Sequence, residues 1–376
     1  MRRVCYVSGT RADFGLMAQT LCLVAQHDEI DLSVCVTGMH LSSTFGHTID
    51  EIEASGIRIC ARVPVDMERS SGSAMAKALG GELIGMTEVF ECERPDLVMV
   101  LGDRGEMLAA ALAAIHLNIP IVHLHGGERS GTVDEPVRHA LSKLSHYHFV
   151  ATEGARERLI RMGEDPDHIF VTGAPGLDRL VVMAKGSREE LCAMTDFNPK
   201  RPIALVVFHP VLQESEDAGR QTQAIMAALL ACKLQALCLM PNADAGGSLI
   251  RQTLEGYRTR PDLRLVTHLP RRDFVSWMAV SDIMVGNSSS GIIEAASFGL
   301  PVVNIGNRQK DRERSGNTID VPAETEAIRR GMLCALEGPR GPWINVYGHG
   351  QAGERIVELL TTLPLTPQLM LKSNGY

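Results

Sequence analysis

The chain alternates short apolar runs with longer segments whose apolar residues recur at helical spacing. In the first half, apolar and β-branched runs that predict buried strands occur at 3–8, 30–37, 57–63, 97–101, 119–123, 148–152 and 169–172. Helical spacing separates several of these runs, at 14–26, 72–93 and 106–117. Strands that alternate with helices of this length are typical of βαβ units, so this half predicts a parallel sheet.

A second series of the same kind follows. Strands are expected at 203–208, 235–240, 263–266, 283–286 and 301–305, and later helices at 324–337 and 353–360. A stretch with several prolines, 173–202, separates the two series. The sequence therefore predicts an α/β fold of two Rossmann-type, doubly wound domains that face a central cleft. We expect an N-terminal domain over 1–178, with the C-terminal segment 353–376 packing back on it, and a second domain over 179–352.

Titratable residues gather just beyond two of the first-half strands. Between Leu101 and Phe149 they are Asp103, Arg104, Glu106, His116, His123, His125, Glu128, Asp134, Glu135, Arg138 and His139. The carboxyl ends of parallel strands form the ligand-binding edge of such a sheet. We expect acid–base chemistry there, because proton abstraction needs two groups with separated pKa values.

A metal site is the alternative interpretation of this cluster, with the ligands His123, His125, Glu128 and His139. The spacing of these residues matches no ordinary ligand motif, and HExxH is absent from the sequence. We therefore expect no metal.

Two strand–helix turns have the character of anion sites. The turn SGTRADFG at 8–15 combines a glycine with Arg11, although it is no GxGxxG fingerprint. The stronger motif is VGNSSSG at 285–291, where the hydroxyls of Ser288, Ser289 and Ser290 meet free N–H groups at a helix start. Such a turn could hold a diphosphate. Glu294 could then bind a ribose, and Arg308 could close on the diphosphate.

Further polar residues follow other strands. His40 lies in a glycine-containing loop, His209 precedes a proline, and Asp244 shares a loop with Asn242 that could hold a ribose or a base edge. Each of these residues could equally be an ordinary structural or solvated loop residue.

Composition narrows the class of protein. The chain has 376 residues, 45% of them hydrophobic and 22% charged, and no apolar run long enough to cross a membrane. A net charge of −8 and a pI of about 5.9 argue against general nucleic-acid binding. Nine cysteines without a CxxC pair indicate reduced thiols in a cytoplasmic protein.

Several of these motifs occur together, in order, over nearly the whole chain: SGTRADFG, VTGMHL, MVLGDR, HLHGGE, RHALSKLSHYHF, FHP, VGNSSSGIIEA and GLPVVNIGNRQ. Together they resemble the UDP-N-acetylglucosamine 2-epimerases, and most closely the hydrolysing branch that supplies sialic acid synthesis. The resemblance implies a GT-B-like architecture with the nucleotide in the C-terminal domain, no cofactor, and a homodimer. It also implies a reaction in which C2 loses a proton as UDP leaves C1, and water then adds to the resulting glycal to give N-acetylmannosamine.

The resemblance assigns roles residue by residue. Asp103 and Asp134 match carboxylates that handle protons, and His209 matches a histidine near the diphosphate. The residues that match UDP-binding positions are Arg11, Arg104, Asn242, His268, Ser288, Ser289, Glu294 and Arg308. His125 stands where non-hydrolysing relatives have a glutamate, which leaves open whether His125 or Glu128 takes that role. We expect Asp103 and Asp134 to act as a pair, with His125 and Glu128 assisting.

Three alternatives remain from the sequence. The sugar could be 2,4-diacetamido-2,4,6-trideoxyglucose, as in legionaminic acid synthesis, rather than N-acetylglucosamine. The protein could be a GT-B glycosyltransferase, which would need an acceptor, or a UDP-sugar sensor that binds without turnover.

Overall fold

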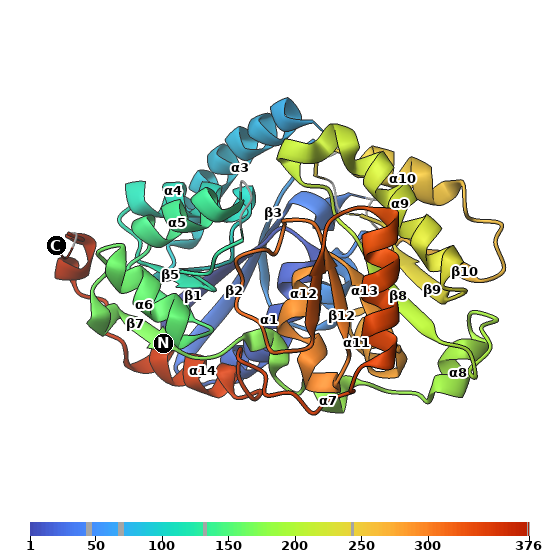
Figure 1. Ribbon diagram of the computed structural model, residues 1–376. Helices are drawn as coiled ribbons and strands as arrows, with labels where there is room; N and C mark the ends of the chain where they lie inside the picture. The colour runs from blue at the N-terminus through green and yellow to red at the C-terminus, as the bar shows by residue number, and fades with distance from the viewer. Residues whose placement is uncertain (43–46, 67–70, 131–133, 242–243, 374, 376) are drawn as a thin grey trace.

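Two parallel β-sheets stand side by side, each covered by helices on both faces (Figure 1). The computed structural model describes residues 1–42, 47–66, 71–130, 134–241, 244–373 and 375. The first sheet has the strands β1 Arg2–Ser8, β2 Ile30–Thr37, β3 Ile59–Val63, β4 Leu97–Leu101, β5 Ile121–Leu124, β6 Tyr147–Val150 and β7 Ile169–Val171. The second has β8 Ile203–Val207, β9 Gln235–Leu239, β10 Leu263–Val266, β11 Ile283–Gly286, β12 Val302–Ile305 and β13 Thr318–Val321.

The helices of the first half are α1 Arg11–Ala25, α2 Ile49–Ala54, α3 Gly72–Glu93, α4 Gly105–His116, α5 Asp134–Leu144, α6 Glu153–Arg161, α7 Leu180–Met183 and α8 Arg188–Ala193. Those of the second half are α9 Ala218–Ala231, α10 Gly247–Glu255, α11 Arg271–Val280, α12 Ser289–Ile293, α13 Thr325–Glu337 and α14 Ala352–Thr362. One face of the first sheet packs against α1, α2 and α14, and the other against α3, α4 and α5. Burial on both faces explains why the strands read as unbroken apolar runs.

The order of the strands decides where a ligand can bind. The first sheet runs β3-β2-β1-β4-β5-β6-β7 and the second β10-β9-β8-β11-β12-β13. The order reverses between β1 and β4 in one sheet and between β8 and β11 in the other. Ligands of doubly wound sheets bind beyond the carboxyl ends of the strands at such a switch point. The loops after these four strands are therefore the expected walls of a site.

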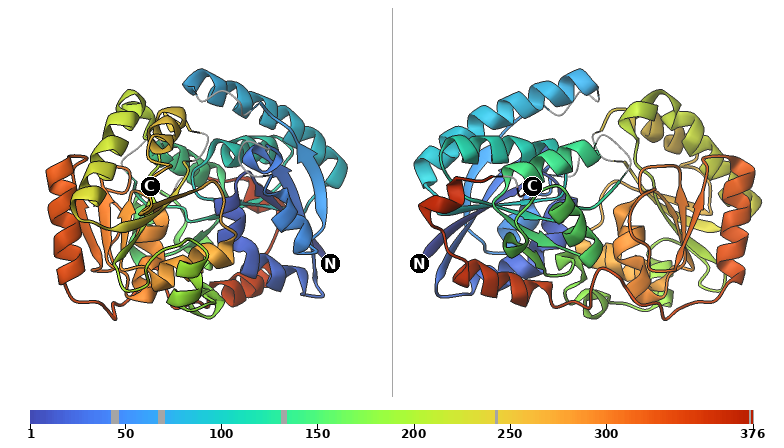
Figure 2. Two further views of the ribbon diagram at one scale, coloured as in Figure 1. Left: turned by 90° about the vertical axis from the view of Figure 1, so that its right-hand side faces the viewer. Right: turned by 60° about the vertical axis from the view of Figure 1, so that its left-hand side comes forward.

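The chain ends on the first domain. Helix α14 packs against α1, far from α13, which covers the second sheet (Figures 1 and 2). Ile356 and Leu360 of α14 belong to the core of the first sheet. Beyond the helix, Arg2 Nη2 donates to Leu363 O over 2.8 Å and the Tyr147 hydroxyl donates to Pro364 O over 2.7 Å.

Three further observations concern the sequence expectations. The prediction of two doubly wound sheets is confirmed, but it omitted β13, a partly exposed edge strand of mixed polarity that pairs with β12. Within the described ranges, every helix is too short or too polar to span a bilayer. All nine cysteines are free thiols.

The packing of α14 can be tested by truncating one of its core side chains. Ile356 is fully buried, so Ile356→Ala should lower the free energy of unfolding by about 2–5 kcal/mol. Ile344, of the same residue type, is 82% exposed, and Ile344→Ala should change it by less than about 0.5 kcal/mol. Urea denaturation of both variants measures the difference. Equal effects of the two substitutions would show that α14 does not contribute to the core.

Candidate active site

A cleft of about 370 Å³ lies where the carboxyl edges of the two sheets meet. Loops after β1, β4 and β5 line it from the first domain, and loops after β8, β11 and β12 from the second. The residues predicted from the sequence that line this cleft are Arg11, Asp103, Arg104, His125, Glu128, His209, Ser288, Ser289, Ser290 and Arg308. The two walls therefore bring the titratable cluster opposite the serine-rich turn.

Asp103 is held in place from behind the first wall. The guanidinium of Arg138, only 1% exposed, donates to Asp103 Oδ2 and also to the carbonyl of Glu128 over 3.1 Å. His123 Nε2 donates to Gly102 O over 2.7 Å and fixes the backbone just before Asp103. Burial lowers the pKa of His123 to about 3, so this ring is neutral and structural.

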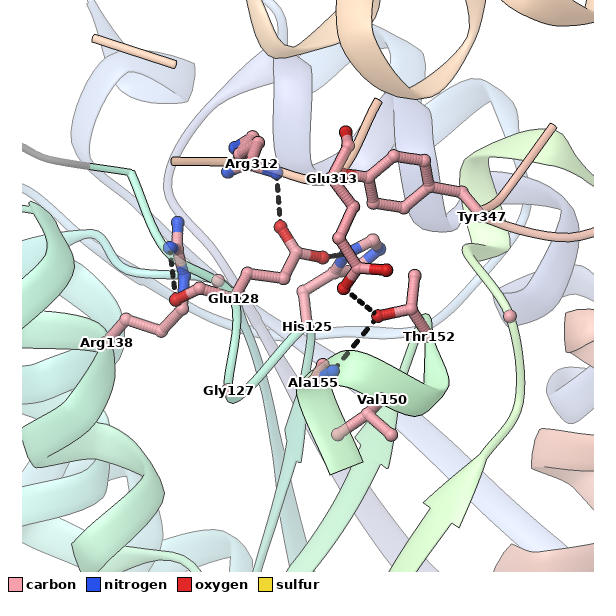
Figure 3. A network of polar contacts seen from close by, with 12 residues as sticks. His125, Gly127, Glu128, Arg138, Val150, Thr152, Ala155, Arg312, Glu313 and Tyr347 are labelled. Carbon is pink, nitrogen blue, oxygen red and sulfur yellow. Dashed lines mark hydrogen bonds and ion pairs between the residues drawn. The ribbon is translucent and has the colours of Figure 1, made fainter. Parts of the chain in front are cut away.

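His125, Glu128 and Arg312, which all line the cleft, form a chain of buried contacts (Figure 3). Glu128 Oε1 accepts from His125 Nδ1 over 2.5 Å, and Arg312 Nη1 donates to Glu128 Oε2. Burial acts to raise the pKa of Glu128, but Arg312 and His125 outweigh it and hold that pKa well below its usual range. Glu128 is therefore an ionised carboxylate.

This arrangement determines which nitrogen of His125 can react. Because Glu128 accepts a proton-bearing Nδ1, the other nitrogen, Nε2, is left for the cleft. Nε2 is buried and makes no hydrogen bond to the described protein. The backbone of His125 has φ +60°, a strained conformation for a residue with a side chain, and its N–H donates to Phe149 O. Glu128 thus orients the ring of His125, and Nε2 is the ring nitrogen that has no hydrogen-bond partner among the described residues.

The second wall has the features of an anion site. Ser288 caps α12, where its hydroxyl accepts from the N–H of Ser290. The backbone of His209 is fixed by Asn287, whose side-chain amide exchanges two 2.8 Å hydrogen bonds with it. Arg308 Nη1 donates to Asn287 O over 3.2 Å. Burial and the positive charge of Arg308 lower the pKa of His209 to about 3, so its ring is neutral.

Other predicted residues lie elsewhere. His40 is fully buried, with Nε2 bonded to Ser8 Oγ over 2.9 Å and Nδ1 to Thr48 Oγ1 over 2.8 Å. His268 bridges the domains: its Nδ1 accepts from Arg11 over 2.7 Å, and its Nε2 lies 2.9 Å from the carboxylate of Glu51. Both ring nitrogens of His40 and both of His268 therefore have a protein partner.

Four more predicted positions complete the account. Glu294 is fully buried and ion-paired to Arg271, and Arg271 rather than Glu294 reaches the cleft. Asp244 pairs with Arg104 of the opposite domain at 3.4 Å. Asn242 and the side chain of Asp134 lie outside the described part of the chain.

Sequence reasoning named Arg138 but missed Arg271 and Arg312. Arg312 belongs to a polar loop after β12, a strand whose carboxyl end points to the cleft. Its charged sequence, DRER at 311–314, at such a strand end is the signal that could have identified it.

A pair of buried carboxyl groups lies behind the first wall. A Cβ on Gly9 would lie 2.7 Å from Glu106 Cγ, so the turn after β1 needs a glycine to pack against Glu106. Glu82 of α3 accepts from Thr37 Oγ1 over 3.2 Å. Burial and the neighbouring charge of Glu106 raise the pKa of Glu82 to about 8. Glu82 is thus a protonated acid near neutral pH.

The comparisons with known proteins agree with this fold. The fold and cleft define a GT-B-like, two-domain architecture: the crystal structure of UDP-GlcNAc 2-epimerase from Neisseria meningitidis bound to UDP-GlcNAc matches with a TM-score of 0.81 at 23% identity, over 95% of this chain and 99% of that one. A sequence profile described as UDP-N-acetylglucosamine 2-epimerase matches residues 23–361. The chain belongs to this family, which confirms the resemblance seen in its motifs.

Two relatives differ in the sugar that their names give. The chain is 54% identical to the UDP-N,N'-diacetylbacillosamine 2-epimerase (hydrolyzing) of Legionella pneumophila over 376 residues, the whole of both chains. It is 33% identical to a UDP-N-acetylglucosamine 2-epimerase of Neisseria meningitidis serogroup B over 335 residues, 87% of this chain and 86% of that one.

The protonated state of Glu82 makes stability depend on pH. Below about pH 4.3 this carboxyl is protonated in both folded and unfolded chains; between there and about pH 8 only the unfolded chain ionises. The contribution of Glu82 to the free energy of unfolding therefore falls as pH rises through this window. Glu82→Gln removes that contribution, so the variant should gain stability over wild type from pH 5 to pH 8, by at most about 1.4 kcal/mol per pH unit.

Urea denaturation at several pH values measures this difference. The control is Glu91→Gln, which changes an exposed glutamate of the same helix. Parallel stability curves for Glu82→Gln and wild type would contradict the assignment.

Proposed function

We propose that this protein is a hydrolysing UDP-sugar 2-epimerase that acts on UDP-N,N'-diacetylbacillosamine. The observation that carries the proposal is the cleft itself: a wall of serine hydroxyls and Arg308, suited to an anion, faces Asp103 and the Glu128-oriented ring of His125. This is what an elimination needs, since a base must reach C2 while the diphosphate leaves from C1. The choice of sugar is supported by the full-length, 54% identity to the Legionella pneumophila enzyme.

The proposed reaction has two stages. The second wall, with Ser288, Ser289 and Arg308, binds the diphosphate and stabilises the charge that develops as the C1–O bond breaks. A base of the first wall takes the C2 proton, and the electrons of the C2–H bond form the C1=C2 double bond of a glycal. Water then adds its hydroxyl to C1, and C2 receives a proton on the opposite face. The products are UDP and the 2-epimeric sugar.

We assign the proton transfers to residues of both walls. Asp103 and His125 line the first wall and are the proposed acid–base groups, with Glu128 assisting His125 and Asp134 retained from the family resemblance. His209 lines the second wall, and we assign to it the transfer of a proton to the leaving diphosphate. We also propose that the protein is a cytoplasmic homodimer and that its product is used in legionaminic acid synthesis.

The chemistry of the cleft supports the trideoxy sugar. Diacetylbacillosamine is 2,4-diacetamido-2,4,6-trideoxyglucose, so it has a methyl group where N-acetylglucosamine has a hydroxymethyl group. Apolar side chains, Leu16, Met39 and Leu101, line the cleft on the first-domain side. UDP-N-acetylglucosamine is the second candidate, supported by the 33% identical Neisseria relative.

The substrate is tested by incubating the protein with each UDP-sugar in D2O, with no acceptor present. We expect UDP release from UDP-N,N'-diacetylbacillosamine, one deuterium at C2 of the product, and kcat/KM about tenfold or more above that for UDP-N-acetylglucosamine. Equal or greater activity with UDP-N-acetylglucosamine would reverse the choice of sugar. If neither compound released UDP without an acceptor, the glycosyltransferase and sensor alternatives would replace the epimerase.

The division of labour between the walls gives a separate prediction. Asp103→Asn keeps the size of the side chain but removes the carboxylate, so kcat should fall about 10²–10⁴-fold with little change in UDP affinity. Arg308→Ala should instead weaken UDP binding about tenfold or more, since it removes a charged hydrogen-bond donor. Calorimetric titration with UDP and a UDP-release assay separate the two effects. An equal loss of UDP binding in both variants would contradict these separate roles of the two walls.

A further inference from the structure

Three consecutive residues of the second domain reach across to the first. In the loop after β12, Asp311 pairs with Arg129 at 3.1 Å, and Arg312 pairs with Glu128. Glu313 accepts from the Thr152 hydroxyl over 2.6 Å, as Figure 3 shows. The same loop begins with Arg308, on the anion-binding wall. One short segment thus joins the diphosphate side of the cleft to its acid–base side.

Two of these contacts are ion pairs, and they differ in burial and therefore in how much energy their loss would cost. The side chains of Asp311 and Arg129 are 30% and 47% exposed, and an ion pair so exposed to water contributes little. The side chains of Arg312 and Glu128 are 8% and 4% exposed. Removing one partner of a buried pair leaves an uncompensated charge, which is costly. The Arg312–Glu128 pair is the contact of this loop on which the site depends.

Glu128 passes this constraint on to His125. One carboxylate oxygen is bonded to Arg312 and the other to His125 Nδ1, so the position of the guanidinium sets the orientation of the carboxylate and hence of the ring. Tyr347, nearly fully buried, donates to Glu313 O over 3.1 Å and fixes the loop next to Arg312 (Figure 3). At the end of this chain His125 Nε2 is buried without a partner.

We propose that Arg312 is a positioning residue for the epimerase reaction, supplied by the nucleotide-binding domain, which aligns Glu128 on His125 so that the imidazole can exchange a proton with the sugar. This inference rests on the proposed function and adds a condition to it. The ring of His125 is set for reaction only while the loop 308–313 lies against the first domain. The domain that holds UDP thereby completes the acid–base group of the other domain.

The test is a double-mutant cycle on kcat, measured by UDP release from the UDP-sugar that wild type turns over. Arg312→Gln should lower kcat about 100-fold, with UDP affinity within threefold of wild type. Because Arg312 acts through Glu128, the double variant Arg312→Gln with Glu128→Gln should be no slower than Glu128→Gln alone, within about threefold. Arg312→Lys keeps the charge without the planar fork and should recover part of the rate.

The matched control is Asp311→Asn, which removes the neighbouring exposed ion pair and should leave kcat within twofold of wild type. Multiplicative losses in the double variant, a wild-type kcat in Arg312→Gln, or an equal loss of UDP affinity and kcat would overturn the inference. If Arg312→Gln does not fold, the same cycle with Arg312→Lys decides between these outcomes. Failure of the proposed function is distinct, because wild type itself would then release no UDP.

Discussion

A buried carboxylate needs a cation or several hydrogen bonds, and this requirement shapes the cleft more than any other. Asp103 is paired with Arg138, Glu128 with Arg312, and Glu294 with Arg271. Each arginine lines the cleft, and each is well buried. Each ion pair places a guanidinium against a carboxylate in or beside the cleft, where charges interact more strongly than in bulk water.

The topology explains why these charges meet. Parallel strands direct their carboxyl ends to one edge, and the reversal of strand order between β1 and β4 and between β8 and β11 opens a crevice at each edge. This geometry follows from the alternation of apolar strands and helices, so the two sheets and several polar residues of each wall could be predicted from the sequence. Asp103, His209 and Ser288 all follow a strand directly or within two residues, and all line the cleft.

The rest depends on contacts that the linear pattern does not contain. Arg312 and Glu128 are 184 residues apart, and nothing in their local sequence pairs them. Glu294 has the spacing of a ribose ligand along its helix, but the fold buries it against Arg271. His40 also follows a strand, yet the turn after β2 directs its ring to Ser8 and Thr48. Strand β13 was missed because an edge strand with exposed faces lacks the continuous apolar run that marks the other strands.

The histidines of the two walls show how environment divides their roles. His123 and His209 are both buried near arginines, and their pKa values of about 3 leave them neutral near pH 7. His123 has both nitrogens engaged, so its neutrality is structural. His209 differs, because Arg308 is a principal cause of its lowered pKa after burial, and a bound diphosphate would offset that positive charge. Binding of the nucleotide would therefore raise the pKa of His209, so the leaving group itself would favour the protonated form that can donate to it.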